Sequence, residues 1–214
     1  MMESRIKICG ITGPEDASSC HRLGADYLGV IFAESPRKVT RGKAAEIRNA
    51  VPNARLVGVF ADGDIDAITE TARGCMLNMI QLHGDESSAY CTDLHARTKL
   101  PLVKAFRMGA VPGPEGLAAY GAVKFFLLDL EKGGPRTGRV FAELIEQAAR
   151  MVKQGCRLFL AGGLSPENVR LALERVSPFG VDVCSGVEEK PGVKDLDGVS
   201  RFIAEVRGCP PAKK

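Results

Sequence analysis

The sequence predicts a single α/β domain with the fold of a (β/α)8 TIM barrel, and three observations lead to that prediction. Short apolar runs alternate with helical periodicities along the chain of 214 residues, and no composition shift marks a linker. Eight strand–helix units in 214 residues take about 27 residues each, against about 31 in a typical eightfold barrel. The predicted strands also carry apolar side chains at one parity and ionisable groups at the other.

Each predicted strand is a short apolar run that precedes a helical pattern. We expect one barrel domain over residues 1–208 and a frayed tail over residues 209–214. The predicted strands cover residues 5–9, 27–32, 56–60, 79–83, 102–106, 123–129, 157–161 and 181–185.

The predicted helices show amphipathic spacing and residues that favour helix starts. Ser165 before Pro166 predicts a start, because serine caps helices and proline suits their first turn. Thr12, three residues ahead of Glu15, predicts a capping box at the first helix. Apolar residues recur at helical spacing over residues 141–152, 169–176 and 196–206.

Side-chain parity favours the barrel over an open doubly wound sheet. Helices cover both faces of an open sheet, so its central strands are apolar at both parities. Here one parity is apolar, as with Ile6 and Ile8 in the first strand and Val103 and Ala105 in the fifth. A barrel interior that is polar only at its top accounts for the other parity, which holds Lys7, Cys9, Gln81, His83, Lys104, Asp129 and Asp182.

Composition and charge exclude several classes of protein. The chain has 29 Lys+Arg against 26 Asp+Glu, and a balance of +3 argues against a broad nucleic-acid surface. No apolar run approaches the roughly 18 residues of a membrane span, and the first residues lack signal-peptide features, so we expect a cytoplasmic protein. The seven cysteines form an odd set without a CxxC pair, which indicates neither a disulfide framework nor a metal site.

Two residues at predicted strand ends have side chains suited to proton transfer, and active sites of such barrels lie at those ends. Cys9 shares a face with Lys7, whose charge is expected to lower the thiol pKa; the alternative is a buried core thiol. Asp129 ends an apolar strand, where desolvation is expected to raise its pKa and make it a general acid. The alternative is a carboxylate that caps backbone N–H groups of the next loop.

Three further features are candidates for binding a charged ligand. Glycine-rich segments at 161–165 and 185–187 follow the last two strands, where this fold usually binds phosphate; as ordinary turns they need no ligand. Arg37, after the second strand, is a candidate carboxylate clamp or a solvated loop cation. His83, after the fourth, is a candidate proton donor or ligand, or a hydrogen-bonded structural histidine.

Motifs that occur in order along nearly the whole chain narrow these alternatives. Together they resemble the phosphoribosylanthranilate isomerases, enzymes of tryptophan biosynthesis. The main motifs are Lys7-Ile8-Cys9-Gly10-Ile11-Thr12, Ser35-Pro36-Arg37, Gln81-Leu82-His83-Gly84-Asp85-Glu86, Leu127-Leu128-Asp129, Leu160-Ala161-Gly162-Gly163-Leu164, Ser185-Gly186-Val187-Glu188 and Gly192-Val193-Lys194-Asp195.

The resemblance implies an Amadori rearrangement of N-(5-phosphoribosyl)anthranilate to 1-(2-carboxyphenylamino)-1-deoxyribulose 5-phosphate, without cofactor or metal. It implies that Asp129 is the general acid, which protonates the ribose ring oxygen and opens the ring to a Schiff base. It implies that Cys9 is the general base, which removes the proton from ribose C2. The enolamine that results tautomerises to the ketone.

The resemblance also implies residues that bind this phosphoribosyl substrate. Arg37 matches the family residue that contacts the anthranilate carboxylate, and Asp182 matches an interior polar residue near the substrate amine. His83 matches a recurrent family residue to which the resemblance gives no firm role. The phosphate-binding positions are matched by Gly163, Ser185 and Gly186.

Two departures from the family pattern leave other hypotheses open. The family's contiguous glycine loop after the strand-six aspartate is interrupted here, at residues 133–138, and Cys184 stands where serine is common. One alternative is another phosphosugar isomerase or epimerase on the same fold, which the phosphate loops alone would permit. Another is a catalytically silent phosphoribosyl-binding or assembly protein. We expect a small-molecule partner, no nucleic acid and no membrane, and either a monomer or a homodimer.

Overall fold

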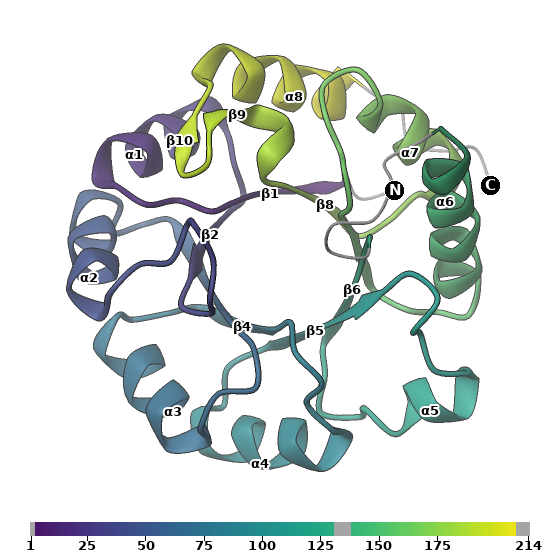
Figure 1. Ribbon diagram of the computed structural model, residues 1–214, viewed down its shortest axis with the longest axis horizontal. Helices are drawn as coiled ribbons and strands as arrows, with labels where there is room; N and C mark the ends of the chain where they lie inside the picture. The colour runs from purple at the N-terminus through teal and green to yellow at the C-terminus, as the bar shows by residue number, and fades with distance from the viewer. Residues whose placement is uncertain (1–2, 131–137, 209–214) are drawn as a thin grey trace.

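The computed structural model describes residues 3–130 and 138–208, and these contain a closed barrel of eight parallel strands (Figure 1). Each strand pairs with the next, and the last pairs with the first. This confirms the predicted TIM barrel and excludes the open sheet. The barrel strands are β1 (Arg5–Cys9), β2 (Tyr27–Ile31), β3 (Arg55–Phe60), β4 (Met79–Leu82), β5 (Leu102–Arg107), β6 (Phe125–Asp129), β7 (Leu158–Leu160) and β8 (Gly180–Val183).

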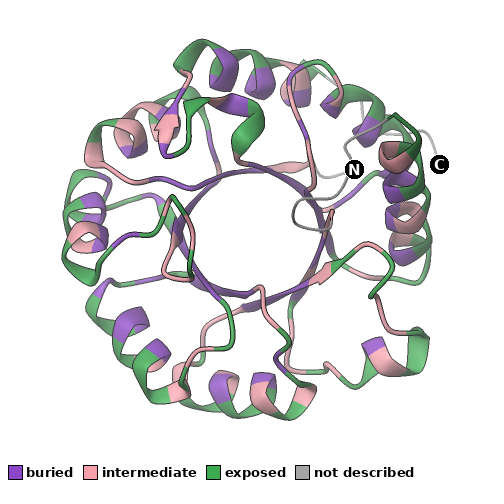
Figure 2. Cartoon of the chain, viewed as in Figure 1, coloured by how far each residue is buried: buried purple, intermediate pink, exposed green. Residues whose placement is uncertain are grey.

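Helices surround the barrel as an outer ring and turn their buried sides toward the strands (Figures 1 and 2). The connection after β8 differs from the others, because the 3-10 turn Ser185–Val187 and the hairpin of β9 (Glu188–Lys190) and β10 (Val193–Lys194) precede its helix. The helices are α1 (Pro14–Leu23), α2 (Arg41–Ala50), α3 (Ile65–Gly74), α4 (Ser88–Thr98), α5 (Pro114–Ala118), α6 (Gly138–Lys153), α7 (Val169–Val176) and α8 (Leu196–Gly208).

The predicted strands and helices are present, with differences of a few residues at their ends. Both predicted helix starts are wrong. Thr12 does not cap α1, because its hydroxyl donates to the carbonyl of Gly192 (2.6 Å), and α1 follows Gly13. The turn after Ser165 is not yet α-helix, since α7 begins only after Asn168. Local spacing assigned Thr12 and Ser165 to helix caps. In the structure the Thr12 hydroxyl bonds to the backbone of a distant residue, and Ser165 lies in a turn that precedes the helix.

Two apolar clusters lie on the two sides of the strands, in line with their alternation. The larger cluster packs strand residues such as Ile8 and Leu128 against the helices. Aromatic rings of Phe125 and Phe159 meet inside the barrel, with centroids 5.6 Å apart. The interior cluster contains Tyr27, Val57, Met79, Val103, Ala105, Phe125, Leu127, Phe159 and Ala161.

The fifth strand reverses the predicted parity. Val103 and Ala105 lie in the interior cluster, so Lys104 points out toward the helices. Paired residues of neighbouring strands share a face, and Lys104 pairs with Leu82 of β4 and Phe126 of β6, both on the helix side. The register of the neighbours sets the orientation of this strand, and the prediction that Lys104 faces inward is wrong.

Lys104 is buried on the helix side because a buried carboxylate lies there. Its Nζ lies 3.0 Å from Glu86 Oε2, and the two side chains are 3% and 1% exposed. The ammonium also donates to the carbonyls of Gly84 (2.6 Å) and Ala105 (3.1 Å). These contacts compensate the desolvation of both charges and fix the loop that follows β4.

Two sequence features fall wholly or largely outside the described residues. The predicted tail at 209–214 lies beyond the end of α8, and positions 133–137 of the interrupted glycine loop are not described either. Within the described part of the chain, no helix combines the length and the apolar character that a membrane span requires.

We expect the substitution Lys104→Met to lower the free energy of unfolding by about 3–5 kcal/mol, because it leaves the Glu86 carboxylate buried without its cation. Urea unfolding followed by circular dichroism measures the loss. Lys153→Met on the exposed face of α6 is the control and should change stability by about 0.5 kcal/mol or less. Equal losses in the two variants would contradict a stabilising role for the buried pair.

Candidate functional site

A cavity of about 260 Å³ lies at the carboxyl ends of the barrel strands. It joins residues from the beginning, middle and end of the chain, as a closed barrel does with its strand ends. All eight predicted site residues line it, namely Cys9, Arg37, His83, Asp129, Gly163, Asp182, Ser185 and Gly186. The residues that the sequence analysis selected therefore share one cavity, and their roles as site residues stay predictions.

Cys9 ends β1 and reaches the cavity although it is only 7% exposed. Its neighbour in β2 is Gly29, where a Cβ atom would lie 2.7 Å from Cys9 Sγ, so the glycine makes room for the sulfur. Burial raises the thiol pKa, and the nearby ammonium of Lys7 acts against burial without overcoming it. The Lys7 charge lowers the Cys9 pKa, as predicted. The prediction is wrong for the pKa as a whole, because burial raises it by more.

Lys7 and Asp182 form a buried ion pair inside the barrel, with Nζ and Oδ2 2.7 Å apart. The carboxylate outweighs burial at the amine and raises the Lys7 pKa, so this side chain stays charged. Lys7 precedes Cys9 by two residues on the same face of β1, so the polar interior extends deeper than the predicted top layer. The second oxygen, Asp182 Oδ1, is buried and has no hydrogen-bond partner in the described part of the chain.

Asp129 ends β6 and uses its two carboxylate oxygens differently. Oδ1 accepts the backbone N–H of Leu130 (2.7 Å), which is the capping contact expected as an alternative role. Oδ2 lies 3.4 Å from Nε2 of His83, and each of the two side chains is about 30% exposed. One oxygen therefore orients the carboxylate while the other faces the histidine.

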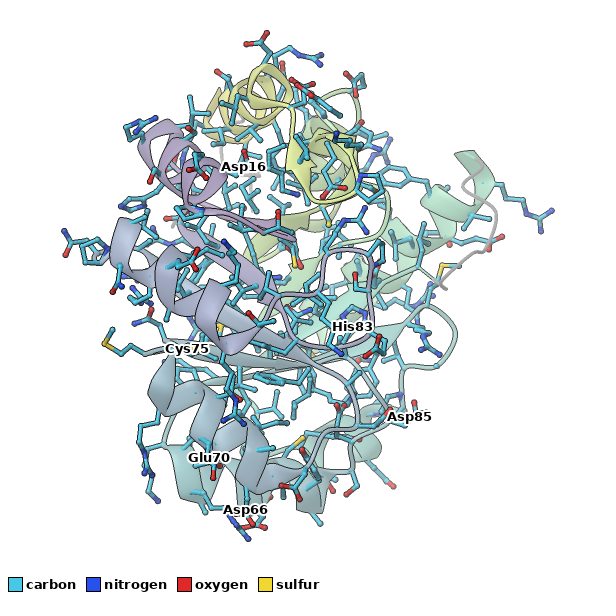
Figure 3. The ribbon with its side chains drawn as sticks, turned by 60° about the vertical axis from the view of Figure 1, so that its left-hand side comes forward. Asp16, Asp66, Glu70, Cys75, His83 and Asp85 are labelled. Carbon is cyan, nitrogen blue, oxygen red and sulfur yellow. The ribbon has the colours of Figure 1, made fainter. Side chains whose placement is uncertain are left out.

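His83 follows β4 and is oriented by Gln81. The Gln81 side-chain amide is hydrogen-bonded to His83 Nδ1 (3.0 Å), and the other ring nitrogen, Nε2, faces Asp129. Figure 3 shows His83 inward of α3, whose Asp66 and Glu70 lie at the outside of the molecule. The histidine is thus both hydrogen-bonded and part of the cavity wall.

The two glycine-rich loops contact each other at one side of the cavity. A Cβ atom on Gly186 would lie 1.9 Å from the carbonyl oxygen of Leu164, so only glycine permits this approach. Asn168 holds the loop after β7, because its side chain donates to the Gly163 carbonyl (2.9 Å) and accepts from the Ser165 N–H (2.9 Å). The loops form a fixed backbone surface of the kind that binds phosphate.

Arg37 also lines the cavity and is held by a residue that the sequence analysis did not assign. Its Nε and Nη2 donate to the carboxylate of Glu188, with the shortest distance 2.6 Å. The side chain is 17% exposed, which excludes the alternative of a solvated loop cation. Lys194 donates to the same carboxylate (2.8 Å). Glu188 and Lys194 both occur in the motifs quoted above. No spacing along the chain connects them to Arg37, which is about 150 positions away.

These contacts define what the cavity can do chemically. It brings together a thiol and a carboxylic group, both capable of proton transfer, a guanidinium and two glycine-rich loops. A small ligand with anionic groups at two ends fits that arrangement better than a neutral one. Among the described residues, no group of three or more His, Cys, Asp or Glu side chains is placed to hold a metal ion.

Comparison with known sequences gives one consistent result. A protein-family model described as N-(5′-phosphoribosyl)anthranilate (PRA) isomerase matches residues 6–205. An N-(5′-phosphoribosyl)anthranilate isomerase from Geobacter sp. (strain M21) is 43% identical over 208 residues, which cover 95% of this chain and 98% of that protein. The enzyme of the same name from Halorhodospira halophila is 41% identical, with 96% and 97% covered.

Solved structures with the same fold agree with the sequence matches. Phosphoribosyl anthranilate isomerase from Thermotoga maritima superposes with a TM-score of 0.84 at 35% identity, over 96% of this chain and 99% of that one. A complex of such an isomerase with reduced 1-(o-carboxyphenylamino)-1-deoxyribulose 5-phosphate has a TM-score of 0.79 at 33% identity, with the same coverage.

We expect the Cys9 thiol to titrate above the ordinary value of 9.0, because burial disfavours the thiolate more than Lys7 favours it. The difference in thiolate absorbance between the wild type and Cys9→Ser, followed from pH 6 upward, isolates this thiol from the others. A midpoint below 9.0 would show instead that the Lys7 charge dominates.

Proposed function

Because the chain belongs to the N-(5′-phosphoribosyl)anthranilate isomerase family, we propose that the cavity at the strand ends is where it carries out that family's reaction. The enzyme converts N-(5′-phosphoribosyl)anthranilate to 1-(2-carboxyphenylamino)-1-deoxyribulose 5-phosphate, an Amadori rearrangement in tryptophan biosynthesis. The observation that carries the proposal is the gathering of every predicted site residue around one cavity. The location in the cytoplasm and the state as monomer or homodimer stay predictions.

Asp129 is the general acid of the proposed mechanism. In its protonated form it gives a proton to the ribose ring oxygen, and the ring opens to a Schiff base. The backbone N–H of Leu130 fixes Oδ1, which supports Oδ2 as the oxygen that faces the substrate. His83, with its Nε2 3.4 Å from Oδ2, orients the carboxyl group toward the cavity.

Cys9 is the general base. Its thiolate removes the proton from ribose C2, and the enolamine tautomerises to the ketone of the product. The raised pKa of the thiol has two consequences, since it lowers the fraction of thiolate at neutral pH and strengthens the base that is present. The Lys7 ammonium beneath the sulfur stabilises the thiolate when it forms.

The remaining residues hold the two anionic ends and the amine of the substrate. The backbone around Gly163, Ser185 and Gly186 binds the phosphate, and Arg37 binds the anthranilate carboxylate. Asp182 lines the same cavity, and its oxygen Oδ1, which has no partner within the described residues, accepts the hydrogen of the substrate amine. Lys7 holds the other oxygen of this carboxylate and keeps it in place.

We expect purified protein to consume freshly generated N-(5′-phosphoribosyl)anthranilate. The reaction removes the anthranilate-type fluorescence of the substrate, so a fluorometer follows it directly. The same gene should restore growth without tryptophan to a strain that lacks this step. A rate no greater than that without enzyme, together with failed complementation, would refute the function.

We expect Cys9→Ser and Asp129→Asn each to lower kcat by about 10²–10⁴-fold, because each removes a proton-transfer group. Cys184→Ser, which changes another thiol in the same cavity, and Asp85→Asn on the exposed loop after β4 are the matched controls and should stay within about threefold of wild type. Circular dichroism checks that all four variants are folded. Full activity in Cys9→Ser or Asp129→Asn would disprove the role of that residue.

A further inference from the structure

The carboxylate of Glu188 is the centre of a buried cluster at the edge of the cavity. Glu188 begins β9, immediately after the turn that contains Ser185 and Gly186, and its side chain is only 3% exposed. Arg37 binds it from the loop after β2, and Lys194 binds it from β10. The backbone N–H of Gly192 adds a further contact at 3.3 Å.

This carboxylate is ionised, and both of its oxygens are used. Burial alone would raise the Glu188 pKa, but the hydrogen bonds from Arg37 and Lys194 outweigh burial and hold it below its usual value. Oε2 accepts from Arg37 Nη2 (2.6 Å), and Oε1 accepts from Lys194 Nζ (2.8 Å). Arg37 Nε contacts both oxygens, at 2.9 and 3.0 Å, so the guanidinium plane is fixed against the carboxylate.

The charges of the cluster explain why two cations surround one acid. Arg37 and Glu188 alone form a neutral pair, and a neutral pair attracts a ligand carboxylate weakly. Lys194 adds one positive charge, which gives the cluster a formal charge of +1. Its side chain is 0% exposed and does not reach the cavity, so the ligand meets the excess charge through Arg37, which is 17% exposed.

We propose that Glu188 and Lys194 are positioning residues for Arg37. Glu188 fixes the orientation of the guanidinium, and Lys194 supplies the positive charge that Glu188 would otherwise cancel. The Arg37 guanidinium is then held in one orientation, and the positive charge of the cluster attracts the carboxylate of the substrate. This inference rests on the proposed function, in which Arg37 binds the anthranilate carboxylate.

The hairpin of β9 and β10 also links the two ends of the substrate site. Glu188 follows the phosphate loop in sequence, and Lys194 lies 3.5 Å from the carbonyl of Cys184, the residue before that loop. The hairpin therefore contacts both the start of the phosphate loop and Arg37.

Binding of two stable analogues tests the proposal without turnover. The first is reduced 1-(2-carboxyphenylamino)-1-deoxyribulose 5-phosphate, and the second is the same compound made from aniline, which lacks the carboxylate. Calorimetry gives Kd for each, and the ratio of the two values is the carboxylate preference. Lys194→Met should lower this preference about tenfold by weakening only the first analogue, because a nearby charge is lost. Lys190→Met on the exposed part of the same hairpin should leave it unchanged.

A double variant separates charge from general damage to the structure. Glu188→Gln combined with Lys194→Met restores the formal charge of +1, so it should recover part of the preference lost in Lys194→Met. Lys194→Gln, which keeps a hydrogen-bond donor without the charge, provides a second single variant and should behave like Lys194→Met. Urea unfolding confirms that each variant is folded before binding is measured.

The outcomes distinguish this inference from the proposed function. An unchanged preference in both Lys194 variants, an equal loss for both analogues, or no recovery in the double variant would overturn the inference while the function stands. Wild-type protein that binds neither analogue would overturn both. Wild-type protein that binds both analogues equally would overturn the role of Arg37 and with it the inference.

Discussion

Strand β1 pairs with β8 along four register positions, from Arg5 with Gly180 to Ile8 with Val183, and the rest of the structure depends on this closure. An open sheet would leave the backbone groups of both edge strands unpaired. Closure also brings Lys7 against Asp182 in the interior. Two charges buried in that position are stable only because they meet there, so the register of the barrel and the floor of the site are determined together.

Two sets of buried charges lie beside the cavity. One is the Lys7–Asp182 pair, and the other is the cluster of Arg37, Glu188 and Lys194. The Lys7–Asp182 pair is formally neutral and supports Cys9 from below, while the cluster around Glu188 carries an excess positive charge at the wall. The glycine loops add backbone groups without a net charge. In the proposed function, a substrate with two anionic ends meets Arg37 at one end and the glycine loops at the other, and the formally neutral Lys7–Asp182 pair lies beneath Cys9.

Much of the fold, and the gathering of the selected residues around one cavity, could be predicted from sequence because both rest on local patterns. Strands follow from short apolar runs, and the side chain that ends a barrel strand lies at the site by geometry alone. The orientation of Lys104 could not be predicted in this way, because Val103 and Ala105 suit either face of the strand. The register with β4 and β6 determines which face is inside. The clamp of Arg37 by Glu188 joins residues 151 positions apart, and no spacing along the chain reveals it. The direction of the Cys9 pKa shift could not be predicted from sequence either. The sequence shows the nearby charge of Lys7 but not the burial, which raises the pKa by more than Lys7 lowers it.

The long separation between these partners has a consequence for how the protein is made. A ribosome synthesises Lys7, Cys9 and Arg37 long before Asp182, Glu188 and Lys194, the residues that complete the ion pairs of Lys7 and Arg37. During translation the early strands emerge with an unpaired edge and with an ammonium that cannot yet be buried beside its carboxylate. The nascent chain gains its barrel, and with it any catalytic capacity, only when β8 and the hairpin after it have left the exit tunnel.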